Sequence, residues 1–164
     1  MKVRDFTLED ISALLGWLEG TDRRFLVQFT GPKYRFPLDE VQLRSGMEGT
    51  EYRLFMVVQE DGSPVGHFQF IRLDQEKGET TIGRILLNPE LRGKGMGTEM
   101  VREALRFGQE RYGLRKFDLA VFGFNESAHG CYKKLGFQET GREEVCYDGI
   151  GETWVRISMT RELG

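Results

Sequence analysis

The chain has 164 residues, of which 39% are hydrophobic and 30% charged, a composition typical of one folded domain with its own core. The net charge of −3 argues against nonspecific nucleic-acid binding, and no apolar run approaches the length of a membrane span. The two cysteines have no metal-type spacing with either histidine, and the N-terminus lacks the apolar core of a signal peptide. We therefore expect a soluble, cytoplasmic protein, with a single domain over residues 1–164 and no metal site.

The first fifty residues favour helices after one short strand at 3–6. Thr7, with Asp10 three residues later, forms a variant of the capping box that predicts the start of a helix. Residues 20–37 interleave aromatic and basic side chains, and we expect an irregular packed loop there, with the lining of a substrate pocket as the alternative. A second helix is predicted over 37–49.

From residue 52 the apolar pattern takes the period of strands, interrupted by two helices. The first helix follows residue 97 and ends at Gly113, and the second covers residues 126–135. A strand that returns through the first helix runs parallel to the strand before it, so the predicted sheet is mixed. The strands predicted after residue 50 are 52–59, 64–73, 79–87, 116–122, 137–147 and 153–160.

The stretch at residues 86–97, LLNPELRGKGMG, joins a predicted strand to a predicted helix. Glycines at such a junction allow a tight turn and a close approach of the backbone to a ligand, and the free amides of the helix point at an anion. Nearby cations add positive charge. The stretch therefore predicts a phosphate-binding turn, formed by Arg92, Gly93, Lys94, Gly95, Met96 and Gly97.

Three phosphate-binding motifs compete for this turn. A nucleotide-triphosphate loop requires Ser or Thr after its lysine, but Lys94 is followed by Gly95. A dinucleotide fingerprint requires GxGxxG, and the chain has GxGxG. The third pattern, (Q/R)xxGx(G/A), matches residues 92–97, and NESAHGCYKKLGF at 125–137 matches Nxx(A)xxxYxKxGF in the expected order. With both motifs, the chain resembles the GNAT superfamily of acetyl-CoA-dependent N-acetyltransferases.

This resemblance implies an α/β fold, with a mixed and mostly antiparallel sheet of about seven strands, about four flanking helices and two central strands that splay apart. It also implies acetyl-CoA as the acetyl donor, with its pyrophosphate on the turn at 92–97 and its arm along the main chain of Leu86 and Leu87. The Leu87 amide is the candidate oxyanion donor, and Tyr132 the candidate general acid. A core aromatic is the alternative role for Tyr132. Asn125 serves as a helix cap, as a contact to the cofactor arm, or as both.

The general base is not assigned by the resemblance. Many relatives place a glutamate in the fourth strand, where this chain has Thr81. Glu79 is nearby, but the sequence does not determine which way its side chain faces. His67 and His129 are the other nearby titratable residues, and each has an ordinary structural explanation. We favour an ordered water molecule as the base.

The leading hypothesis is an enzyme that moves an acetyl group from acetyl-CoA to a primary amine by direct attack in a ternary complex. Similarity to the RimJ/RimL-like branch, in GRILLNPELRGKGMG and FTGPKYRFPL, favours a protein N-terminus as the acceptor. A polyamine or other cationic amine, attracted by acids near the terminal hairpin, is the alternative acceptor. A sensor that binds acetyl-CoA without turnover is the alternative class. We expect a monomer or a homodimer, and neither nucleic acid nor membrane as a partner.

Overall fold

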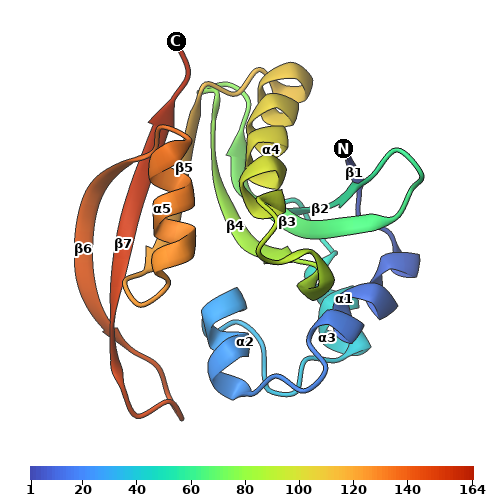
Figure 1. Ribbon diagram of the computed structural model, residues 1–164, viewed down its shortest axis with the longest axis vertical. Coiled ribbons are helices and arrows are strands. Elements are labelled where there is room, and N and C mark those ends of the chain that lie inside the picture. Colours follow the sequence, from blue (N-terminus) through green and yellow to red (C-terminus); the bar gives the residue numbers. More distant parts are fainter.

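The computed structural model describes residues 1–164, and its centre is one seven-stranded sheet in the order β1-β2-β3-β4-β5-β7-β6 (Figure 1). The strands are β1 (Lys2–Asp5), β2 (Tyr52–Val58), β3 (Pro64–Asp74), β4 (Glu79–Leu87), β5 (Lys116–Phe122), β6 (Gln138–Cys146) and β7 (Thr153–Glu162). The helices are α1 (Ile11–Trp17), α2 (Arg23–Thr30), α3 (Glu40–Gly46), α4 (Met96–Tyr112) and α5 (Glu126–Lys134).

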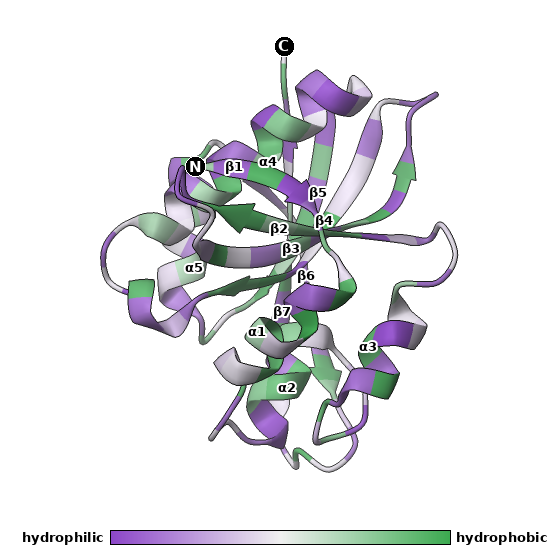
Figure 2. Cartoon of the chain, turned by 90° about the vertical axis from the view of Figure 1, so that its right-hand side faces the viewer, coloured by the Kyte–Doolittle hydropathy of each residue, from purple (hydrophilic) through white to green (hydrophobic).

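The sheet separates two hydrophobic cores, because successive side chains of a strand point to opposite faces. In β2, Leu54, Met56 and Val58 pack with α1, α2 and α3, while Phe55 and Val57 pack with α4 and α5 on the other face. All five side chains are buried. Figure 2 shows β2 coloured mostly as hydrophobic. A strand covered on both faces has no polar alternation, which is why its sequence is a continuous apolar run.

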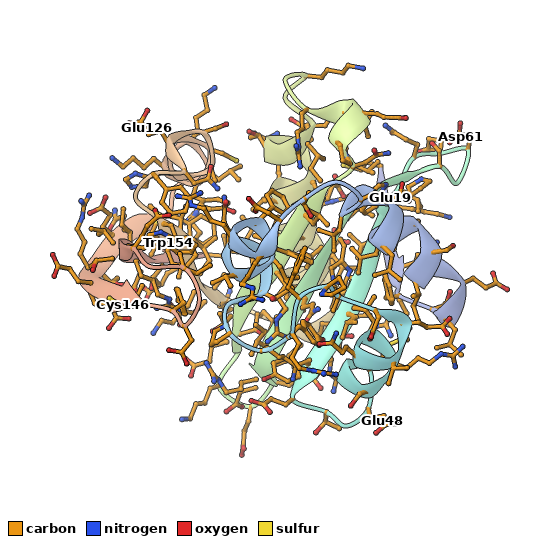
Figure 3. All side chains as sticks on the ribbon, turned by 90° about the horizontal axis from the view of Figure 1, so that it is seen from below. Glu19, Glu48, Asp61, Glu126, Cys146 and Trp154 are labelled. Carbon is orange, nitrogen blue, oxygen red and sulfur yellow. The ribbon has the colours of Figure 1, made fainter.

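Several charged side chains lie at the outside of this arrangement. In Figure 3, Glu48, Asp61 and Glu126 are at the periphery, and Trp154 and Cys146 mark the β6–β7 pair on one side of the molecule. None of the helices combines the length and the apolar composition that a bilayer crossing requires.

The mixed sheet predicted from the sequence is confirmed. Strands β1 to β4 form an antiparallel meander, and β4 pairs in parallel with β5. The β4–β5 pairing covers only Glu79–Thr81 against Lys116–Asp118, and beyond it the two strands diverge (Figure 1). The predicted ends of β4 and β5 are correct to the residue, and α4 ends at the expected Gly113, whose φ is 67°.

The expectation of an irregular loop over residues 20–37 is wrong, because this segment contains α2. Asp22 caps the helix by accepting a hydrogen bond from the Phe25 amide at 2.9 Å. Phe25 and Phe29 then lie one turn apart on one face. The second predicted helix is also shorter than expected, since α3 begins only after Asp39, which caps it in the same way.

Substitution of Gly108 tests the packing of α4 on the sheet. A Cβ atom at this position would lie 2.8 Å from Phe117 and 3.1 Å from Phe70, whose rings are fully buried. We expect Gly108→Ala to lower the free energy of unfolding by about 2 kcal/mol, because overpacking forces buried rings to shift. Gly16 in α1 has no neighbour within 4 Å, so the control Gly16→Ala should stabilise by up to about 1 kcal/mol through helix propensity. Urea unfolding measures both, and a loss of stability in both variants would contradict this explanation.

Candidate active site

The divergence of β4 from β5 opens a cleft of about 870 Å³. Its walls come from β4, β5, α2, α5 and the turn that leads into α4. Of the predicted site residues, the cleft brings together Leu86, Leu87, Arg92, Gly93, Gly95, Gly97, Asn125 and Tyr132. The side chains of Lys94 and Met96 do not line it: Lys94 is exposed, and Met96 packs against the core.

The backbone of Leu87 faces this cleft. The Asn88 amide donates to the Val65 carbonyl at 2.8 Å, and Leu87 and Leu86 are the next residues in the same antiparallel register. Hydrogen-bonded and non-hydrogen-bonded pairs alternate along such a ladder, so the amide of Leu87 points away from β3 and that of Leu86 toward it. Since β5 has already diverged, the Leu87 amide has no strand to pair with. Of the two leucines, Leu87 therefore has the amide that a ligand in the cleft can reach.

The turn before α4 presents further free amides. Gly93 and Gly95 have φ values of 76° and 75°, a backbone conformation that residues with a side chain rarely adopt. No neighbouring atom lies within 4 Å of the position that a Cβ would take at either glycine. The amides of Met96, Gly97 and Thr98 make no backbone hydrogen bond, as expected for the first turn of a helix. With the positive end of the helix dipole behind them, they form a site that an anion can approach closely.

Asn125 is both a helix cap and a cleft residue. Its Oδ1 accepts a hydrogen bond from the Ala128 amide at 3.3 Å at the start of α5. The cap uses only the oxygen, so the two donors of the Asn125 side-chain amide stay available to a ligand.

Tyr132 reaches the cleft from α5. Its side chain is only 7% exposed and packs edge-on against Phe137, with the ring centroids 6.0 Å apart. The hydroxyl makes no hydrogen bond within the protein. Since every fully buried side-chain polar atom has a hydrogen-bond partner, the hydroxyl oxygen is not fully buried, and it is open to the cleft that Tyr132 lines. Burial raises the pKa of Tyr132, which keeps the hydroxyl protonated at neutral pH.

His67 does not face the cleft but belongs to a buried chain of hydrogen bonds. Its Nδ1 donates to the Phe55 carbonyl at 2.9 Å, so its Nε2 accepts from the Gln69 amide at 3.1 Å. Gln69 Oε1 in turn accepts from the Arg84 guanidinium at 2.8 Å. Burial lowers the pKa of His67 to about 4, so the ring is neutral at pH 7. The histidine positions Gln69 and is not accessible to a substrate amine.

No carboxylate takes the place of the missing glutamate in β4. Glu79 lies at the paired end of β4, and neither it nor Thr81 lines the cleft. His129 binds Glu139 at 2.8 Å on the outside of α5. Glu126, the first residue of α5, is the acidic residue that lines the cleft.

Residues 20–37 contribute to the cleft through Phe25, Gln28 and Phe29 of α2, as the alternative of a pocket lining predicted. Cleft residues that the sequence did not single out include Arg84 of β4 and Thr98 of α4. The α2 residues were recoverable, because Asp22 is an N-cap signal followed by aromatic residues at helical spacing. Arg84 had no local signal, since a charged residue inside an apolar strand does not reveal which cavity it borders.

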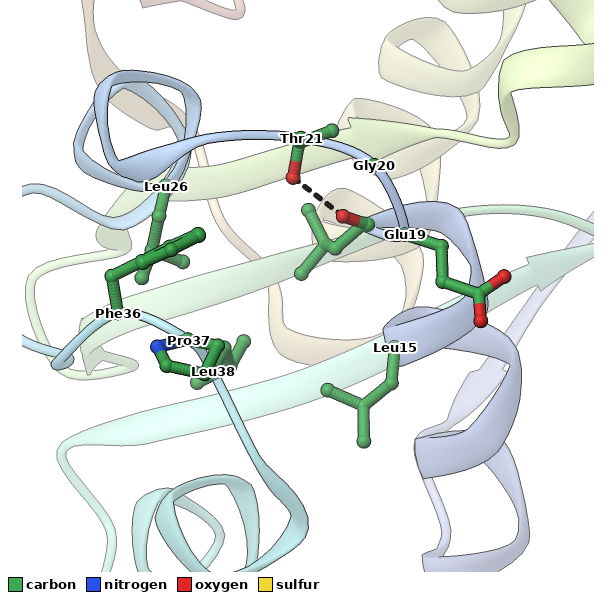
Figure 4. Close-up of a pocket in the computed structure, with 9 residues that line it drawn as sticks. Leu15, Glu19, Gly20, Thr21, Leu26, Phe36, Pro37 and Leu38 are labelled. Carbon is green, nitrogen blue, oxygen red and sulfur yellow. Dashed lines mark hydrogen bonds between the residues drawn. The ribbon is translucent and has the colours of Figure 1, made fainter.

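A second pocket of about 280 Å³ lies between α1, α2 and the segment 36–38. Figure 4 shows Leu26, Phe36 and Leu38 on one side and the Glu19 carboxylate pointing away from them. The Thr21 hydroxyl donates to the Leu18 carbonyl at 2.5 Å, so it is already satisfied. This pocket places no reactive group toward its interior.

The large cleft thus has an anion site at one end, a free strand amide in its wall and a protonated tyrosine. These features suit an acyltransferase with an extended, phosphate-bearing donor. Residues 17–137 match the model of the acetyltransferase (GNAT) family, and the chain belongs to this family. It is accordingly an acetyl-CoA-dependent N-acetyltransferase.

Relatives in sequence agree with this assignment, and a solved structure agrees with the fold. Peptidyl-lysine N-acetyltransferase YjaB of Escherichia coli is 31% identical over 131 residues, which cover 80% of this chain and 77% of that protein. A putative [ribosomal protein bS18]-alanine N-acetyltransferase of Bacillus subtilis is 31% identical over 65% of this chain and 71% of its own length. Spermidine N-acetyltransferase from Vibrio cholerae, crystallised with CoA and spermine, has a TM-score of 0.82 at 18% identity, over 98% of this chain and 94% of that one. It shares the fold.

Proposed function

We propose that the protein acetylates a primary amine, preferably a protein N-terminus, by direct attack on acetyl-CoA in a ternary complex. The observation that carries this proposal is the free Leu87 amide in one wall of a cleft that also receives the Tyr132 hydroxyl. An amide donor and a protonated acid are what acyl transfer from a thioester requires.

In this mechanism the neutral amine attacks the thioester carbonyl carbon. The C–N bond forms, the carbonyl oxygen gains negative charge, and the Leu87 amide donates to it. The C–S bond then breaks, and Tyr132 gives its proton to the departing thiolate sulfur. An ordered water molecule accepts the proton that the amine nitrogen loses, since no carboxylate of β4 faces the cleft. The proton taken up by water returns to the Tyr132 phenolate, and the products are an acetamide and CoA.

The remaining predicted residues hold the donor. The free amides at 93–97 and in the first turn of α4 bind the pyrophosphate, with Arg92 as the cation that lines the cleft. The Arg92 amide is not among them, because it already donates to the Pro89 carbonyl at 3.3 Å. Lys94 contributes charge from the exposed side of the turn, and Met96 its amide. The arm lies along the Leu86–Leu87 backbone, and Asn125 donates to it from the opposite wall.

Both acceptor classes predicted from the sequence have a relative in their favour. The B. subtilis relative is described as an alanine N-acetyltransferase of a ribosomal protein, in line with a protein N-terminus. A polyamine is the second candidate, since spermidine N(1)-acetyltransferase of E. coli is 32% identical over 85 residues and the V. cholerae structure contains spermine.

Acetyl-CoA binding by calorimetry, followed by free-thiol release in the same sample, tests this function. We expect binding and thiol release that depends on an added acceptor, with higher kcat/KM for a peptide with a free N-terminus than for the same peptide blocked at its N-terminus. A higher kcat/KM with spermidine would favour the polyamine reading. Binding without release for any acceptor would contradict the enzyme and support a sensor.

A further inference from the structure

Four charged side chains line the cleft. Three are positive, Arg84, Arg92 and Lys134, and one is negative, Glu126. Arg92 belongs to the turn proposed for the pyrophosphate and stands 5.8 Å from the Phe25 ring. Arg84 lies within β4, and the last residues of that strand separate it from the turn. Its charge therefore has no evident role toward the donor phosphates.

The backbone at Arg84 is distorted. Leu86 pairs with His67 and Gly83 with Gln69, so Arg84 and Ile85 together stand opposite Phe68 in a β-bulge. Arg84 has a φ of 49°, which is uncommon for a residue other than glycine. Bulges of this kind change the direction of a side chain.

The Arg84 guanidinium is held by neutral groups. It donates to Gln69 Oε1 at 2.8 Å and lies over the Tyr52 ring at 4.3 Å and the Tyr34 ring at 5.9 Å. The Gln69 amide is oriented by His67, so the accepting oxygen has a fixed direction. No carboxylate lies within 4 Å of the guanidinium. Arg84 is therefore a partly buried, oriented cation with free donors and no anionic partner.

Acidic residues near the β6–β7 hairpin would attract a polycation, but two of them are paired with arginines. Glu152 pairs with Arg24 at 3.1 Å, and Glu143 pairs with Arg156 at 3.6 Å. The Arg24 guanidinium also stands over the ring of Trp154 at 5.0 Å. The balance of charge at the cleft therefore disfavours a polyamine.

We propose that Arg84 binds a carboxylate of the acceptor, so that the preferred substrates are primary amines that carry a carboxylate close to the amine. This inference rests on the acetyl transfer proposed above. Arg84 and Leu87 line the same cleft and are three residues apart on β4, about 10 Å along an extended strand, so one small acceptor can contact both. A guanidinium binds a carboxylate through two parallel hydrogen bonds. Two sources supply this chemistry, a free amino acid and a peptide whose first residues are acidic.

The test compares acceptors in the thiol-release assay. The acceptors are peptides that differ only in an acidic, neutral or basic pair of first residues, together with a free amino acid and its amide. For the native protein, we expect kcat/KM to be about tenfold higher for the acidic peptide than for the neutral one, the size of one charge-assisted contact. A preference for the free amino acid over the acidic peptide would identify the former as the source. Equal kcat/KM for acidic, neutral and basic acceptors would overturn the inference, while no release with any acceptor would overturn the proposed function itself.

The variant Arg84→Gln should remove the preference, mainly through an about tenfold higher KM for the acidic acceptor, with kcat for the neutral peptide within about twofold. Arg84→Lys keeps the charge and should retain part of the preference. Arg53→Gln is the matched control, because Arg53 also stands over a tyrosine, Tyr112, but does not line the cleft. An acidic preference that persists in a folded Arg84→Gln variant would contradict the inference. If that variant does not fold, the acceptor series of the native protein decides.

Discussion

Replacing Tyr132 with Phe is expected to lower kcat for acetyl transfer by about 100-fold, the low end of the effect of a general acid. The Kd for acetyl-CoA should stay within about twofold. The reason is that the change removes only the hydroxyl, which is open to the cleft, and keeps the ring that packs against Phe137. Because the hydroxyl has no hydrogen-bond partner in the protein, its loss leaves no unpaired group behind.

Single-turnover thiol release measures the chemical step, and calorimetry measures donor affinity in the same preparation. Tyr112→Phe is the control, since Tyr112 packs against the same core from α4 but lies outside the cleft. The control should keep the native kcat. A Tyr132→Phe variant with unchanged turnover would assign Tyr132 to the core alone, with the thiolate protonated by water.

Acidification from pH 7 to pH 4 is expected to cost about 3 kcal/mol of folding free energy through His67 alone. The pKa of this buried ring is lowered from 6.5 to about 4, chiefly by burial, with the nearby positive charge of Arg84 acting in the same direction. Between these two pH values the unfolded chain binds a proton that the folded chain does not. The stability that the folded protein gains from keeping His67 neutral is therefore fully present above pH 6.5, and it is lost as the pH falls toward 4.

Urea unfolding at a series of pH values measures this loss. His67→Gln should be less stable than the native protein at pH 7, because it disturbs the hydrogen bonds to Phe55 and Gln69, but its stability should vary less with pH between 6.5 and 4. His129→Asn is the control, since His129 binds Glu139 near the surface and should leave the dependence on His67 in place. Parallel pH profiles for the native protein and the His67→Gln variant would rule out this linkage.

The sequence predicts the strands and the glycine turn that borders the cleft well, because both depend on local chemistry. The period of two in β5, the bounds of β4 and the glycine end of α4 are properties of short segments. The turn at 92–97 is also local, since positive φ values at Gly93 and Gly95 and free helix amides require only these residue types in this order. The prediction of an irregular loop fails at α2, because the interleaved aromatic and basic residues were not recognised as a capped helix.

The position of Arg84 in the cleft was not predictable in the same way. Arg84 borders the cleft because two residues of β4 stand opposite one of β3, and its guanidinium is oriented through Gln69 and His67, which come from a different strand. A bulge in one strand is decided by how its partner strand pairs with it. Tyr132 is a similar case, because the position of the second motif indicates a role, while only the packing shows that its hydroxyl opens to the cleft.

Residue type and spacing within short segments were enough to predict the family, the mixed sheet and the glycine turn at 92–97. Only the tertiary structure decided that β4 and β5 part beyond Thr81 and Asp118, that the Leu87 amide is left unpaired and that Arg84 lacks an anionic partner. These features depend on which distant segments meet. The sequence of a short segment cannot show these features, because contacts between distant segments create them.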